Sequence, residues 1–225
     1  MAMQQLLDRG MVIGFASGRG RSLHSDLRQW VSAESWERVV VGLYNGAIHL
    51  GLNEELHDLR EPTAWSSAVV DALQDVSNAA EVAIEERGRQ VSLSVVSGAL
   101  CHGVLAAAAR ARLEMAQVRA TVVASGHSID IIESHSSKGA ISREVEERAG
   151  GAALTIGDQG QLGGNDYELL KASSWTLSVD RCSADPRSCW FAGSGADVGP
   201  DLLLRYLRAL RPRGGVFAVT GLAVS

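Results

Sequence analysis

Three polar clusters in the sequence carry residue types that could bind a phosphoryl group and a metal ion. They are Ser17-Gly18-Arg19, Lys138-Gly139, and Asp158 with Asn165-Asp166 on the glycine-rich loop GDQGQLGGND. A hydroxyl and backbone N–H groups at the start of a helix suit a phosphate, and a lysine can neutralise its charge. Two aspartates offer the hard oxygen ligands that Mg²⁺ prefers together with phosphate and water. The combination predicts a phosphoryl-transfer site, where catalysis is mainly positioning and charge stabilisation.

Each cluster also has a purely structural interpretation. Ser17-Gly18 could be a plain strand-to-helix turn, Lys138 a solvated residue at a helix start, and Asp166 a helix cap. A cap explains one carboxylate, but it does not explain Asp158 and the glycines of the same loop. Because all the clusters occupy corresponding positions of a strand–helix pattern, we favour the functional interpretation.

The elements that must position these clusters follow from the neighbouring apolar runs. MVIGFA (11–16), RVVVGL (38–43) and AALTIGD (152–158) have the length and continuous apolar character of buried strands, and amphipathic helical patterns lie between such runs. This alternation predicts a parallel sheet with helices on both faces. Open α/β sheets bind ligands at the carboxyl ends of their strands, where the clusters lie. Further strands are expected over 174–180 and in the tail 214–225.

The pattern changes between the first and second clusters. A helical pattern over 63–77 precedes two alternating runs about an Arg87-Gly88 turn; a second helical pattern over 102–116 precedes a hairpin about Ser125-Gly126. This αββαββ order is typical of an antiparallel α+β module inserted into the parallel-sheet domain. We therefore predict a core domain over 1–52 and 135–225 and an inserted domain over 53–134.

Composition argues against several classes of partner. The net charge of −5 gives no electrostatic reason to expect nucleic acid or an anionic membrane surface. No apolar stretch approaches the roughly 20 residues of a membrane span, and MAMQQLLDRG lacks the features of a signal peptide. Cys101, Cys182 and Cys189 form no CxxC motif, which favours reduced thiols in a cytoplasm. We expect a cytoplasmic protein that acts on a small molecule, in an oligomeric state that the sequence leaves open.

Taken in order, the motifs resemble those of the haloacid dehalogenase-like phosphohydrolases with a C2-type cap. That branch includes sucrose-phosphate and trehalose-phosphate phosphatases and the phosphomannomutases. VIGFASGRG resembles the second family motif, SSKGAI the third, GDQGQLGGNDYELL the fourth, and YNGA the NGA turn of this branch. The resemblance implies a Rossmann-like core with an inserted cap, Mg²⁺ as cofactor, and a phosphorylated metabolite, such as a sugar phosphate, as substrate.

The resemblance also implies roles for individual residues. In capped members of the family, side chains of the cap select the substrate. It implies catalytic roles for Ser17 and Lys138, phosphate binding by Ser17, Gly18 and Lys138, substrate binding by Arg19, Asn45, Gly46, Glu85 and Arg87, with Arg89 on the same cap hairpin, and metal binding by Asp158, Asn165 and Asp166.

The first motif of the family is absent from the sequence. It is an Asp-x-Asp-x-Thr run that supplies the nucleophile, the general acid/base and part of the metal shell. Without it the aspartyl-phosphate route cannot run, so we expect the chain to be inactive. Two alternatives stay open: a non-catalytic protein that binds a phosphorylated ligand or a partner, and a phosphomannomutase-like isomerase, which the longer spacing of the fourth motif favours.

The missing motif also removes the central strand of the sheet, as the resemblance implies. We expect a mis-assigned start codon or a truncated chain to explain the loss. For the chain as it stands, we expect the slot between 11–16 and 152–156 to be filled, preferably by the tail 215–224, because buried strand edges need hydrogen-bond partners. The alternatives are a strand from a neighbouring chain and direct pairing of the two inner strands.

Overall fold

The computed structural model describes residues 2–56, 61–80, 82–96, 101–124, 128–194, 197–214 and 216–220, without the side chains of 77–80. The helices are α1 (Ala2–Asp8), α2 (Arg21–Trp30), α3 (Ala64–Ala80), α4 (His102–Met115), α5 (Gly139–Ala149), α6 (Tyr167–Ala172) and α7 (Pro200–Ala209), with 3-10 turns η1 (Ala33–Arg38) and η2 (Tyr44–Gly46). The strands are β1 (Ile13–Ala16), β2 (Val39–Leu43), β3 (Ile48–Gly51), β4 (Val82–Glu86), β5 (Gln90–Val95), β6 (Ala120–Ala124), β7 (Ile129–Glu133), β8 (Leu154–Gln159), β9 (Trp175–Arg181), β10 (Trp190–Phe191), β11 (Leu210–Arg213) and β12 (Val216–Val219).

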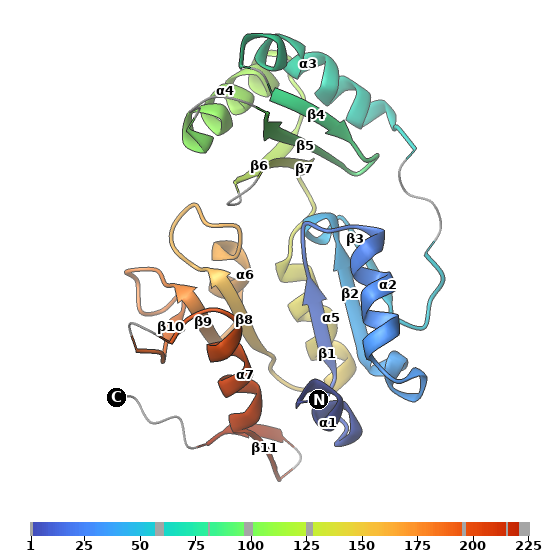
Figure 1. The fold of residues 1–225 in the computed structure, drawn as a ribbon, viewed down its shortest axis with the longest axis vertical. Coiled ribbons are helices and arrows are strands. Elements are labelled where there is room, and N and C mark those ends of the chain that lie inside the picture. Colours follow the sequence, from blue (N-terminus) through green and yellow to red (C-terminus); the bar gives the residue numbers. More distant parts are fainter. Residues whose placement is uncertain are drawn as a thin grey trace.

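The core contains two half-sheets. In the first, β1 pairs in parallel with β2, and β3 returns antiparallel to β2 after the η2 turn. In the second, β8, β9 and β10 are parallel. The whole of β2 is buried, as expected for a β-branched run covered on both faces. The parallel pairs confirm the predicted α/β class and direct the carboxyl ends of β1 and β8 toward the cap (Figure 1).

Helices hold the two half-sheets together. α5 packs on β1 and β2, α6 packs on β8, and α5 and α6 contact each other. A second connection lies at the opposite end of the core, where α1 packs against α7 (Figure 1). Helix packing therefore sets the separation of β1 and β8.

The slot between β1 and β8 differs from the prediction. Among the described residues, β1 pairs with β2 alone and β8 with β9 alone, so direct pairing of the inner strands is not observed. The described part of the tail forms β12, which pairs antiparallel with β11. Insertion of the tail into the slot was therefore a wrong prediction; positions 215 and 221–224 of that segment lie outside the described residues. A hairpin with the segment just before it closes a much shorter loop than a crossing to the sheet centre, and loop closure costs less entropy when the loop is short.

The inserted segment forms the cap, defined here as α3 through β7. Its antiparallel sheet has the order β4-β5-β7-β6, and the sequence order of its elements is the predicted αββαββ. α3 and α4 cover the sheet face that points away from the core (Figure 1). The predicted turn at Ser125-Gly126 lies outside the described residues. The apolar interior of the cap includes Val69, Leu73, Val91, Leu93, Leu105, Ala109, Ile129 and Ile131.

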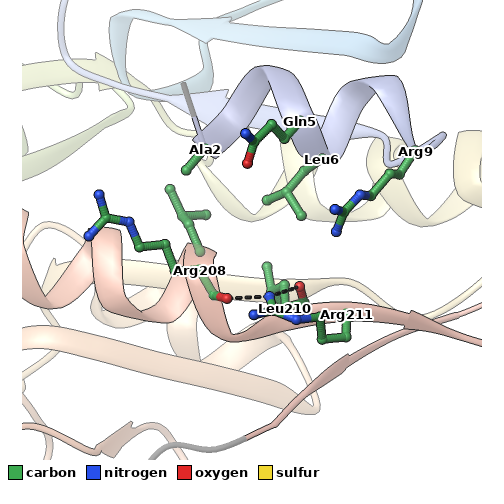
Figure 2. Close-up of a pocket in the computed structure, with 8 residues that line it drawn as sticks. Ala2, Gln5, Leu6, Arg9, Arg208, Leu210 and Arg211 are labelled. Carbon is green, nitrogen blue, oxygen red and sulfur yellow. Dashed lines mark hydrogen bonds between the residues drawn. The ribbon is translucent and has the colours of Figure 1, made fainter.

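A cavity of about 380 Å³ lies between α1 and α7 (Figure 2). It is at the end of the core away from the cap (Figure 1), and none of the predicted site residues lines it. The lining residues are Ala2, Gln5, Leu6, Arg9, Leu207, Arg208, Leu210 and Arg211. Across the described ranges, no helix combines the length and apolarity needed to cross a membrane.

Candidate active site

Ser17 follows the last residue of β1 and is fixed by backbone hydrogen bonds. Its N–H donates to the carbonyl of Gly42 at 3.0 Å, and its own carbonyl accepts the N–H of Asn45 at 2.8 Å. The Ser17 hydroxyl accepts the backbone N–H of Arg19 at 3.1 Å. The segment is thereby held against the end of β2 and the η2 turn, with its hydroxyl at the carboxyl edge of the first half-sheet.

Lys138 and Asp166 connect the two half-sheets. Lys138 directly precedes α5 and Asp166 directly precedes α6. The Nζ atom of Lys138 donates to Oδ1 of Asp166 at 2.8 Å, and the residues are only 8% and 6% exposed. The other carboxylate oxygen of Asp166 accepts the backbone N–H of Asp158 at 2.9 Å. One carboxylate thus ties together the starts of two helices and the end of β8.

The two aspartates have opposite pKa shifts. For Asp166, burial alone would raise the pKa, but the charge of Lys138 and hydrogen bonds from Asp158 and Lys138 outweigh burial and lower it. For Asp158, partial burial raises the pKa, and the hydrogen bond with Asp166 and the charge of that carboxylate raise it further. The pair therefore retains a proton on Asp158 more readily than on Asp166, which is the pattern expected of two close carboxylates.

Gly157 lets Asp166 approach the β8 backbone. A Cβ atom at position 157 would lie 2.8 Å from Oδ2 and 2.9 Å from Cβ of Asp166, closer than side chains pack. The glycine before Asp158 is therefore required by the position of the second aspartate. This explains why the two carboxylates occur together with a glycine between the apolar strand and the loop.

The donor set of the glycine loop fits a divalent cation. Asn165 places its Oδ1 atom in a buried position where it has no hydrogen-bond partner among the described residues. Asp158 is exposed to solvent, where a cation can reach its carboxylate. Within the described part of the chain no cluster of at least three His, Cys, Asp or Glu side chains converges on one point, so the loop offers two carboxylates and the Asn165 amide oxygen as candidate ligands. Hard oxygen ligands of this kind suit Mg²⁺.

The η2 turn brings the Ser17 and Lys138 clusters into contact. Asn45 bonds to Ser17 through its backbone, and Gly46 approaches the backbone of the next cluster so closely that an added Cβ would lie 2.4 Å from the Ser137 carbonyl oxygen and 2.9 Å from the Lys138 nitrogen. The three predicted clusters therefore form one continuous set of contacts.

Several predicted substrate-binding side chains are engaged elsewhere. Arg19 donates to Asp26 of α2. On the cap hairpin, Glu85 and Arg87 form an ion pair with each other. Arg89 pairs with Glu133 at 3.1 Å.

Asn45 instead contacts cap residues that the sequence analysis missed. Its Nδ2 atom donates to Oε1 of Gln90 at 3.1 Å and to Oδ2 of Asp130 at 3.0 Å. Asp130 also accepts the Ser92 hydroxyl at 2.9 Å and the Ser128 hydroxyl at 3.1 Å. Gln90, Ser92 and Asp130 are buried between cap and core.

A sequence signal for these residues existed. Val91, Leu93, Ile129 and Ile131 face the helices of the cap, so the polar residues that alternate with them must point to the other sheet face. That face is the one directed at the core (Figure 1).

Comparison with known proteins shows which fold this is. No family model matches the chain, and no curated protein sequence matches it. Among solved structures, the sucrose-phosphatase from Synechocystis in complex with sucrose and phosphate has a TM-score of 0.59 at 16% identity, over 92% of this chain and 88% of that chain. Trehalose-6-phosphate phosphatase from Aspergillus fumigatus gives 0.55 at 16% identity, over 87% and 78%. A haloacid dehalogenase-like hydrolase from Bacteroides thetaiotaomicron gives 0.57 at 14%, over 84% and 85%.

The chain has the haloacid dehalogenase-like fold with an inserted cap. The motif resemblance is thus confirmed at the level of fold. In this fold, the strand ends and helix starts next to the cap carry Ser17, Lys138 and Asp166, and the sequence contains no Asp-x-Asp run.

Proposed function

We propose that this chain carries a phosphatase-type site that binds a phosphorylated small molecule with Mg²⁺. The observation that carries the proposal is the contact between the predicted clusters, from Ser17 through the η2 turn to Lys138 and on to Asp166. An ammonium group, a hydroxyl and helix-start N–H groups in one place are a phosphate-binding set.

Lys138 can bind the phosphate while it keeps its hydrogen bond to Asp166. Its ammonium has three donors, and Asp166 accepts one of them. The others can donate to phosphate oxygens beside the Ser17 hydroxyl and the Gly18 N–H. Asp166 offsets part of the lysine charge and keeps the ammonium in place, so the site is positioned before the ligand arrives.

Asp158 and the Oδ1 atom of Asn165 would hold the metal ion, with Asp166 behind them. A bound Mg²⁺ supplies charge neutralisation for the phosphate and orients its oxygens. Because burial and Asp166 raise the pKa of Asp158, protons compete with the cation for this carboxylate, and metal binding should weaken as the pH falls.

We infer a sugar phosphate as the ligand class from the polar face of the cap. Gln90, Ser92 and Asp130 offer both donors and acceptors next to Asn45 of the core. Such mixed groups suit the hydroxyls of a polyol, which both donate and accept. These residues are our candidates for recognising the non-phosphate part of the ligand.

Turnover requires a nucleophile that the sequence does not supply in the form of the family motif. We propose that the chain binds its ligand and hydrolyses neither p-nitrophenyl phosphate nor sugar phosphates above background. The non-catalytic alternative is favoured by the same absence. Hydrolysis at ordinary phosphatase rates that Asp158→Ala abolishes would reveal a different nucleophile and refute this part of the proposal.

The binding proposal can be tested by isothermal titration with orthophosphate, with and without Mg²⁺. Lys138→Met should weaken phosphate binding at least tenfold, because a charge-assisted contact contributes about 1.5–3 kcal/mol. Lys171→Met is the matched control, since Lys171 is the other lysine of the chain and is exposed over the Tyr167 ring. Circular dichroism would verify that both variants fold. Equal affinities of wild type and Lys138→Met would refute the site.

A further inference from the structure

Two cysteines outside the proposed ligand site lie against each other between β9 and β10. The Cys182 thiol donates to the carbonyl oxygen of Cys189 at 3.0 Å, and the N–H of Ser183 donates to the Cys189 sulfur at 3.3 Å. Cys182 is half-buried and Cys189 is 2% exposed.

Hydrogen bonds within the loop between the two cysteines fix their positions next to each other. The N–H and the hydroxyl of Ser188 both donate to the carbonyl of Asp185, at 3.0 and 2.7 Å, which turns the chain back. The Thr176 hydroxyl then donates to the Ser188 carbonyl at 3.1 Å and fixes the returning segment to β9. Cys189 is thereby delivered next to Cys182 at the end of the same strand.

We propose that Cys182 and Cys189 are an oxidisable pair that a peroxide converts into an intrachain disulfide. One thiol loses its proton, and the thiolate attacks hydrogen peroxide; the O–O bond breaks to give a sulfenic acid and hydroxide, which takes up that proton as water. The second thiol displaces the sulfenic oxygen as a second water, forming the S–S bond. Both sulfurs are oxidised and the peroxide is reduced to two waters, so no other reactant is needed.

The pair is coupled to the glycine loop that carries Asp158. The Cys189 sulfur lies 4.0 Å from the carbonyl oxygen of Gly160, and a Cβ atom at Gly160 would come within 3.0 Å of that sulfur. Gly160 also donates its N–H to the Arg181 carbonyl at 2.9 Å, beside Cys182. A Cys189 sulfur that turns to Cys182 withdraws from Gly160, so oxidation loosens the loop. Any effect of this oxidation on ligand binding rests on the proposed function, whereas formation of the disulfide is independent of that function.

The surroundings of each thiol determine which cysteines react with peroxide first. Burial, with the hydrogen bond and charge of Cys189, raises the pKa of Cys182 to about 12. Thiolates rather than thiols react with peroxide, so the pair should oxidise more slowly than an exposed cysteine, and faster as the pH rises. Cys101 is exposed and serves as the internal standard.

The test treats the full chain with hydrogen peroxide, blocks free thiols with N-ethylmaleimide in denaturant, and analyses a non-reduced tryptic digest by mass spectrometry. Trypsin cleaves after Arg181 and Arg187, so Cys182 and Cys189 fall on separate peptides that only a disulfide can join. The linked peptides should appear after Cys101 has been oxidised and should vanish on dithiothreitol treatment. Cys101→Ser should retain them, and Cys182→Ser should abolish them.

The proposal is overturned if both peptides are still recovered separately, alkylated or as sulfinic acids, at peroxide doses far above the dose that fully oxidises Cys101. Coupling to the loop has its own readout, hydrogen exchange over residues 157–164 in the reduced and oxidised chain. Exchange should rise several-fold on oxidation, and unchanged exchange would overturn the coupling. Neither measurement uses phosphate or metal, so both stand apart from the proposed function.

Discussion

Neutralising the two neighbouring aspartates should change stability in opposite directions. Asp166→Asn removes the negative partner of Lys138 and leaves a buried ammonium beside an amide. Asp158→Asn removes a charge that burial and Asp166 disfavour. The substitutions are chemically identical and eight residues apart, so the comparison isolates the environment of each carboxylate.

The magnitude for Asp166→Asn follows from the burial of the pair. Breaking a buried ion pair by removing one partner costs about 3–5 kcal/mol, because the remaining charge is uncompensated. For a chain of this size each kcal/mol lowers Tm by about 2–4 °C, which gives a loss of about 6–20 °C. Asp158→Asn should leave Tm unchanged or raise it slightly, since solvent screens the exposed Asp158.

The two groups also have opposite effects on the pH dependence of stability. The folded pKa of Asp166 is below its ordinary value of 3.8, so its stabilisation is present above that value and is lost as the pH falls through the folded pKa. The folded pKa of Asp158 is raised, so its ionisation reduces stability as the pH rises from 3.8 through the folded pKa. Asp158→Asn should therefore reduce the decline of the free energy of unfolding between pH 3.8 and the folded pKa of Asp158.

Urea unfolding between pH 3 and 8 in the presence of EDTA measures both effects, because the chelator removes cations that would stabilise the pair. Asp71→Asn on the exposed face of α3 is the control for an aspartate-to-asparagine change. The double variant Lys138→Met/Asp166→Leu should recover most of the loss, as apolar replacements of buried pairs do. A decrease of more than 2 kcal/mol for Asp158→Asn, or of less than 1 kcal/mol for Asp166→Asn, would refute the reasoning.

Three further outcomes are expected. Gly157→Ala should destabilise the chain by about 1–3 kcal/mol in urea unfolding, because its Cβ would displace Asp166; a neutral effect would mean that the carboxylate can move freely. Asn45→Ala should cost about 1–3 kcal/mol and speed proteolysis between cap and core, since it leaves the buried Asp130 without its core donor; unchanged proteolysis would refute that link. Mg²⁺ titration of the wild type should show weak binding that Asp158→Asn abolishes, whereas tight stoichiometric binding would mean that the glycine loop suffices alone.

The positions of the site clusters were predictable from the sequence because they depend on local structure. Ser17 follows an apolar strand, Lys138 precedes a helix, and Asp166 starts another, and the parallel arrangement of strands brings such ends to one edge. The contact between Gly157 and Asp166 also has a local cause, since it acts within one strand–loop–helix unit.

Features that depend on tertiary placement were not predictable in the same way. The polar face formed by Gln90, Ser92 and Asp130 becomes meaningful only when α3 and α4 are known to cover the other face. The segment LRPR (210–213) shows no strand pattern, and it becomes β11 only because β12 folds back onto it. Glu85 and Arg87 form an ion pair with each other at the end of β4, and their spacing in the sequence does not distinguish this pair from two free side chains.

The Lys138–Asp166 pair has a structural task that a continuous sheet would otherwise perform. In an unbroken sheet, ladder hydrogen bonds fix the strand ends relative to each other. Among the described residues no ladder joins β1 to β8, and the halves are connected by α5 on α6, by α1 on α7 at the far end of the core, and by this pair. The ion pair spans the halves at the edge where Ser17 and Asp158 lie, so the geometry of the proposed phosphate site and the union of the half-sheets depend on the same two side chains. Variants of Lys138 should therefore lose stability and ligand binding together, whereas variants of the cap residue Gln90 should alter ligand selectivity with little change in the core.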